Sequence, residues 1–203
     1  MAIKRIAAPF IYTSESVEPI RNGFVEYDDN DGTIIRTGVC EDMSAEDVLS
    51  GAIVPGFVNA HCHIELSHLH GKFYKGSGMA GFIDQINALR DWAGREVKVG
   101  LTQKWMDKMW NDGVSAMADI SNDDSSFDVK ASHPMYTRTF LEVFGSEPEM
   151  CDGVMADVTA LKHTAEEVGI DAAPTPHSCY TMSPQLLSAS AAAGRGQAGK
   201  EDR

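Results

Sequence analysis

The chain lacks an excess of basic charge. Its 203 residues include 17 lysines and arginines against 30 acidic residues, which gives a formal net charge of −13 at pH 7. Because phosphate binding needs a basic surface, this balance argues against a nucleic acid partner. Long apolar runs are missing too: no stretch approaches the roughly 20 residues that cross a bilayer, and the N-terminus has no sustained apolar signal core. We therefore expect a cytoplasmic protein with no nucleic acid or membrane partner.

Cysteine is scarce and scattered. The four cysteines form no Cys-x-x-Cys pair; they are Cys40, Cys62, Cys151 and Cys179. This spacing provides neither a disulfide framework nor a redox motif, so we expect reduced thiols in the cytosol. Hydrophobic residues make up 43% of the chain and charged residues 23%, which is the composition of a soluble globular protein.

Short β-patterns fill the first part of the chain. They lie at residues 6–12, 23–27 and 33–40, and the sequence Asn30-Asp31-Gly32 between the last two is a hairpin turn signal. We interpret residues 1–50 as a segment of a small N-terminal β-subdomain.

Strands and helices alternate in the rest of the chain. Four strand-like stretches are separated by amphipathic helical stretches, of which the first carries an apolar stripe that includes Met79 and that we interpret as core contacts. This order predicts an α/β protein with a parallel sheet and helical crossovers. A closed (β/α)8 barrel needs eight such units and typically ~250 residues, and residues 51–187 supply about half of that number. The apolar periodicity stops after Leu187, so we predict that residues 188–203 form a disordered tail.

Two histidines end the first of these four strands. In the sequence GAIVPGFVNAHCHIE, residues 51–65, His61 and His63 flank Cys62 and would point to the same face of a strand. Two neutral imidazoles on one face can hold a divalent metal ion. For a bare His-x-His pair, one packed and one solvated histidine is the alternative interpretation.

Two stretches carry a resemblance to a known family. PGFVNAHCHIELSH, residues 55–68, closely resembles the first barrel strand of the amidohydrolase superfamily. PHSCYTMSPQLL, residues 176–187, resembles the segment after the fourth barrel strand in the deaminase and chlorohydrolase branch, with the aminofutalosine deaminase-like members nearest. The resemblance covers about residues 1–187. It implies a β-subdomain followed by about the first four β/α units of a TIM-type (β/α)8 barrel.

The same resemblance implies an activity. Its members are metal-dependent hydrolases of carbon–nitrogen bonds other than peptide bonds, and the branch points to deamination of an amino-substituted heterocycle, a small molecule, by metal-activated water. Within the superfamily, chlorohydrolase and cyclic amidase activities are the alternatives. Homo-oligomer formation stays open.

The resemblance also assigns roles to three histidines. It implies that His61 and His63 bind one divalent metal ion, with zinc as the first choice and iron or manganese as alternatives. It places His177 in the substrate pocket, where it would hydrogen-bond the bound heterocycle; a third metal ligand and a simple loop cap are the alternatives for this residue.

No catalytic acid or base can be assigned from the sequence. The family places these groups on the fifth and eighth barrel strands, and nothing after residue 187 has the pattern of such a strand. We therefore expect a truncated gene product, with a natural half-barrel that pairs with another chain as the alternative. A non-catalytic half-barrel is accordingly the alternative function.

Three carboxylates are weaker candidates for the site. Glu65 lies two residues past His63, and we expect it to bond Lys72 or solvent. Asp119 and Glu142 end the second and third strands, where barrel enzymes place functional groups. For both of them we expect a structural hydrogen-bonding role.

Overall fold

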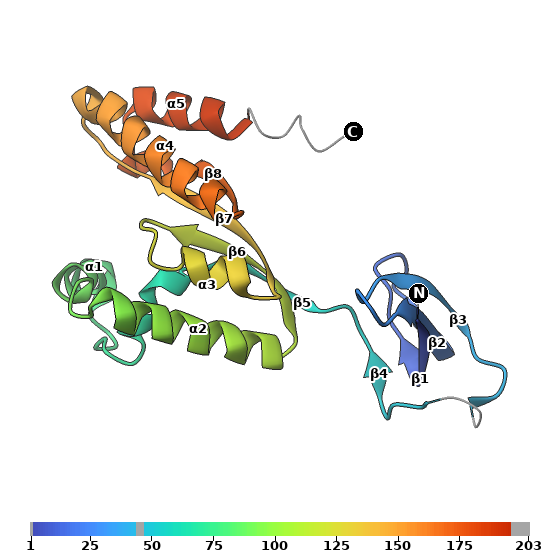
Figure 1. The fold of residues 1–203 in the computed structure, drawn as a ribbon. Helices are drawn as coiled ribbons and strands as arrows, with labels where there is room; N and C mark the ends of the chain where they lie inside the picture. The colour runs from blue at the N-terminus through green and yellow to red at the C-terminus, as the bar shows by residue number, and fades with distance from the viewer. Residues whose placement is uncertain (1, 44–46, 196–203) are drawn as a thin grey trace. The chain divides into compact units, whose positions relative to one another are not determined.

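A computed structural model describes residues 2–43 and 47–195 of the chain. The chain divides into two compact units, Met1–Gly56 and Phe57–Arg203 (Figure 1). No helix within the described residues is long and apolar enough to cross a membrane.

The first unit is a four-stranded sheet. Its strands are β1 (Ile3–Ile11), β2 (Ile20–Asp28), β3 (Ile34–Val39) and β4 (Ala52–Ile53), in the order β3-β2-β1-β4. The β2–β3 hairpin confirms the predicted turn, in which Gly32 has a φ of +77° and the Asp28 carboxylate accepts the Asn30 N–H at 3.0 Å. Strand β4 pairs in parallel with the end of β1. Ala52 and Ile53, which we had assigned to the barrel segment, therefore belong to this sheet.

The second unit contains the predicted parallel sheet. Its strands are β5 (Phe57–Cys62), β6 (Val114–Ser121), β7 (Tyr136–Val143) and β8 (Asp171–Pro176). They run in the order β5-β6-β7-β8, and every neighbouring pair is parallel. The α/β fold with four β/α units is thereby confirmed.

Helices connect these strands and flank the sheet. Among the described residues they are α1 (Gly78–Leu89), α2 (Arg95–Asn111), α3 (Phe127–Ser132), α4 (Cys151–Glu167) and α5 (Pro184–Arg195) (Figure 1). Short 3-10 helices lie at Ile64–Leu69, Pro148–Met150 and Cys179–Thr181. The first of these begins one residue after β5 and packs against α2, whereas α4 and α5 pack against β8.

The helices cover one face of the sheet. Every second residue of β7 is buried, and the side chains of Leu141 and Val143 are fully enclosed. They belong to a core cluster with Phe127, Val158, Ala165, Ile170, Ala172, Met182 and Leu186. Side chains that alternate with the buried ones, such as Glu142, are only partly buried. Because Cys62 packs against the helix-side core, strand alternation places His61 on the opposite, less covered face.

The predicted disordered tail is wrong over residues 188–195. These residues form the last turns of α5, whose first turn is capped by the Ser183 hydroxyl; it accepts the Leu186 N–H at 3.2 Å. Alanine is the strongest helix former, and α5 buries Leu186 in its first turn and Ser190 in this segment. Because residues 188–195 contain no large apolar side chain, their sequence pattern did not indicate a helix; the buried contacts lie mainly in the first turn of α5. Residues 196–203 lie outside the described residues.

The apolar stripe of α1 is not a core contact in this structure. No residue of α1 is buried, and Met79 is 73% exposed. Periodicity identified the helix correctly, but it could not show whether another element would cover the apolar face.

Truncation of Leu141 tests the position of the core. We expect Leu141→Ala to lower the free energy of unfolding by about 2–5 kcal/mol, because it leaves a cavity beneath the helices. The matched control is Met79→Ala on α1, for which we expect a change within about 0.5 kcal/mol. Urea denaturation followed by circular dichroism measures both values. Equal losses would show that the α1 face is buried in solution.

Candidate functional site

The two histidines of the first barrel strand lie close together. His61 is in β5, and His63 follows the strand immediately before the 3-10 helix. Their ring centres are 5.3 Å apart, with 71° between the ring planes. The predicted pairing of these side chains is thus present at the carboxyl end of β5, which is where barrel enzymes place functional groups.

This pair has features that suit a metal ion. Two imidazoles that share one tetrahedral ion at about 2.0–2.1 Å from each nitrogen have ring centres roughly 5 Å apart. The Nδ1 atom of His63 is buried and has no hydrogen-bond partner within the described part of the chain. Over residues 2–43 and 47–195, however, no group of three or more His, Cys, Asp or Glu side chains is arranged to hold a metal ion. The structure therefore offers two nitrogens and does not group His177 with them as a third ligand.

His177 lies at the end of β8 and faces Glu142 of β7. Its Nε2 atom is 3.7 Å from Glu142 Oε1, and its Nδ1 atom is 2.9 Å from the Thr181 hydroxyl. The backbone N–H of His177 donates to the carbonyl of Val143 at 2.9 Å, which extends the β7–β8 ladder by one bond. The side chain is 42% exposed. The ring is thus oriented by its neighbours and still accessible.

The electrostatics of His63 connect these groups. Burial lowers the pKa of His63, while the negative charges of Glu142 and Asp119 oppose that shift and the nearby His61 and His177 rings reinforce it. A lowered pKa favours the neutral imidazole, which is the form that binds a metal ion. Side chains at the ends of β5, β7 and β8 are therefore close enough to influence the charge of His63.

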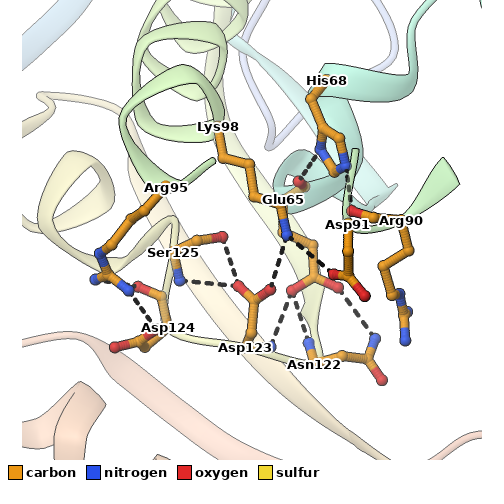
Figure 2. Close-up of polar contacts among 10 residues, drawn as sticks. All are labelled: Glu65, His68, Arg90, Asp91, Arg95, Lys98, Asn122, Asp123, Asp124 and Ser125. Carbon is orange, nitrogen blue, oxygen red and sulfur yellow. Dashed lines mark hydrogen bonds and ion pairs between the residues drawn. The ribbon is translucent and has the colours of Figure 1, made fainter. Parts of the chain in front are cut away.

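Glu65 is not the loop carboxylate that we expected from the sequence. It is 3% exposed, and it accepts the backbone N–H groups of Asn122 and Asp123 at 2.8 and 3.1 Å rather than bonding Lys72 (Figure 2). Burial raises its pKa to about 7, against the lowering effect of these donors. The Asn122 side-chain amide bridges Glu65 at 3.2 Å and Glu142 at 3.0 Å. A hydrogen-bonded chain therefore runs from the β5 end to the carboxylate that faces His177.

Further contacts hold the loop after β6, residues 122–125, in place. The Asp123 carboxylate accepts the Ser125 N–H at 2.9 Å, and Lys98 of α2 places its Nζ atom 3.8 Å from the carboxylates of both Asp123 and Asp91 (Figure 2). On the other side, the His68 ring contacts the backbone carbonyls of Glu65 and Arg90. These contacts restrain both the loop after β6, which binds Glu65, and the 3-10 helix that contains Glu65.

Asp119 is a fully buried carboxylate on the helix side of β6. It pairs with Lys130 of α3 at 2.5 Å, and both side chains are inaccessible to solvent. Its Oδ1 atom accepts the backbone N–H of Ile64 at 2.7 Å, and its Oδ2 atom accepts the Ser121 hydroxyl at 3.0 Å. The structural hydrogen-bonding role expected for Asp119 is confirmed. Its partner Lys130 gave no signal in the sequence, since a lysine on a short helix is ordinarily solvated.

Solved structures share this architecture. The Helicobacter pylori aminofutalosine deaminase in complex with methylthio-coformycin superimposes with a TM-score of 0.76 at 21% identity, over 95% of this chain and 48% of that one. An adenosine deaminase from Xanthomonas campestris with bound zinc gives 0.66 at 17% identity, over 89% and 44% of the two chains. A guanine deaminase from C. acetobutylicum with bound guanine gives a TM-score of 0.67 at 10% identity, over 92% of this chain and 49% of that one.

The chain has the fold of about half of one such barrel. The three structures just named are deaminases, and the fold that the sequence resemblance implied is confirmed. The chain spans about half the length of these relatives. No protein-family model and no curated protein matches it.

Removal of the Lys130 charge tests the buried ion pair. We expect Lys130→Met to lower the free energy of unfolding by about 3–5 kcal/mol, because it leaves the Asp119 carboxylate buried without its counter-charge. The matched control is Lys108→Met, since Lys108 forms an exposed pair with Asp112 worth at most about 0.5 kcal/mol. Chemical denaturation of both variants measures the difference. A loss for Lys130→Met as small as that of the control would mean that the pair is open to water.

Proposed function

We propose that the chain belongs to the amidohydrolase superfamily and serves metal-dependent hydrolysis of a carbon–nitrogen bond, namely deamination of an amino-substituted heterocycle. The observation that carries this proposal is the His61–His63 pair at the carboxyl end of β5, with rings 5.3 Å apart and an unpartnered buried nitrogen. The likeness of the fold to that of deaminases supports it.

His61 and His63 would hold one divalent ion, for which zinc is our first choice because an adenosine deaminase of the same fold has zinc bound. Iron and manganese are the alternatives. A divalent ion there would supply a Lewis acid that lowers the pKa of water at the site. The protein's own contribution is to aim both imidazoles at one point, and burial, which lowers the pKa of His63, favours the neutral form of that ring.

His177 would orient the substrate. Its ring is exposed enough to meet a ligand, and Glu142 and Thr181 on its two sides limit its rotation. A planar heterocycle with ring nitrogens matches an imidazole that can donate or accept a hydrogen bond. The proposal is supported by two structures of similar fold, a guanine deaminase with bound guanine and an aminofutalosine deaminase in complex with methylthio-coformycin.

Zinc titration tests the metal site directly. We expect the purified chain to bind zinc in competition with a chromophoric chelator, and His61→Ala and His63→Ala each to weaken binding at least tenfold by removing one of two ligands. The control is His163→Ala, an exposed histidine on α4, for which no change is expected. Equal zinc affinity in all four proteins would contradict the proposed site.

Ammonia release tests the reaction. With zinc supplied, we expect the chain to release ammonia from at least one member of a panel of aminopurines and aminotriazines, and His61→Ala to abolish that release. A matched mock purification controls for contaminating deaminases. Zinc binding without turnover on any panel member would instead support the alternative, a non-catalytic half-barrel.

A further inference from the structure

The backbone of His63 lies outside the strand ladder. β5 ends at Cys62, and His63 has φ −124° and ψ 73°, a conformation that ends the extended chain before the 3-10 helix. Strand pairing therefore does not fix the direction of this side chain. The next residue supplies an anchor instead: the N–H of Ile64 donates to Asp119 Oδ1 at 2.7 Å, and both residues are buried.

Asp119 is itself held rigidly. Lys130 contacts its Oδ2 atom at 2.5 Å and donates to the Ser121 hydroxyl at 2.8 Å, and that hydroxyl in turn donates to Oδ2 at 3.0 Å. This closed triangle leaves Oδ1 free to face the Ile64 N–H. The orientation of the carboxylate is thus set from the helix side of the sheet.

A second set of hydrogen bonds links the same two segments with the donor and acceptor segments exchanged. Asp119 of β6 accepts an N–H from the segment after β5, whereas Glu65 of that segment accepts two N–H groups from the loop after β6, those of Asn122 and Asp123. Each of the two segments thus contributes a buried carboxylate that accepts backbone N–H groups of the other segment. We refer to Asp119 and Glu65 with these three N–H groups as the reciprocal clamp.

We propose that Asp119 and Glu65 are positioning residues, which fix the His63 backbone so that its imidazole meets the same point in space as His61. The inference rests on the proposed metal site, since it assigns a role toward that site. Neither carboxylate is one of the proposed metal ligands, and Asp119 reaches His63 through the peptide that follows it.

The two oxygens of Asp119 have different partners. Substitutions of this residue can therefore separate an effect on zinc affinity from an effect on stability. Asp119→Asn keeps a carbonyl oxygen that can accept the Ile64 N–H but loses the charge that pairs with Lys130. Asp119→Ala loses both. We expect both variants to be less stable, but only Asp119→Ala to raise the zinc dissociation constant about 10-fold or more, the usual effect of lost second-layer support. Asp119→Asn should stay within threefold of the natural chain.

Two further measurements guard against a loss caused by unfolding alone. The amide of Ile64 should exchange with solvent faster in Asp119→Ala and stay protected in Asp119→Asn, as read by NMR hydrogen exchange on the folded fraction. The control is Thr139→Val, which removes a buried hydroxyl 3.4 Å from Lys130 Nζ and leaves the clamp intact. It should lower the thermal midpoint without changing zinc affinity.

If Asp119→Ala does not fold, Glu65→Ala and Glu65→Gln provide the same comparison from the other arm, with the larger loss of zinc affinity expected for alanine. Zinc affinity that falls in proportion to stability across all variants, Thr139→Val included, would overturn the positioning role. So would unchanged affinity in Asp119→Ala and Glu65→Ala. Failure of the natural chain to bind zinc would instead overturn the proposed metal site, and the inference with it.

Discussion

Parallel pairing of β5 to β8 is the constraint on which the site depends. Parallel strands bring all their carboxyl ends to one edge of the sheet, so residues far apart in sequence, such as His61, Glu142 and His177, meet there. His61 and Glu142 are the next-to-last residues of their strands, whereas His177 lies one residue beyond β8. The ladder therefore sets the direction of the first two side chains, and hydrogen bonds between neighbouring strand ends orient the ring of His177.

Buried carboxylates perform this alignment, and each requires compensation. An ionised carboxylate out of water is costly unless it is paired and hydrogen-bonded. Asp119 has both a counter-charge and backbone and hydroxyl donors. Within the described residues Glu65 has hydrogen-bond donors but no ion pair, and burial raises its pKa to about 7. The two carboxylates therefore differ in their surroundings: Asp119 is paired with a buried lysine, whereas Glu65 has a pKa near neutrality.

The sequence predicted the fold better than the surroundings of the site. Alternating strands and helices identified the parallel sheet, and the His-x-His spacing identified the pair at the end of β5. The same methods missed the burial of Glu65, because its partners are backbone N–H groups that any residues at 122 and 123 could supply. They missed Lys130 because its burial depends on α3 packing over β6, a tertiary contact without a local signature.

Strand alternation accounts for the direction of only one of the two paired histidines. His61 obeys the two-residue period, but His63 has already left the strand. Their rings nonetheless lie 5.3 Å apart, so something other than the ladder must hold His63 in line. The bond from Ile64 to a carboxylate of the neighbouring strand is such a restraint. The proposed motif on β5 therefore depends on β6: His61 and His63 would provide the nitrogens, and we propose that Asp119, through its hydrogen bond with Ile64, restrains the direction of the second ring.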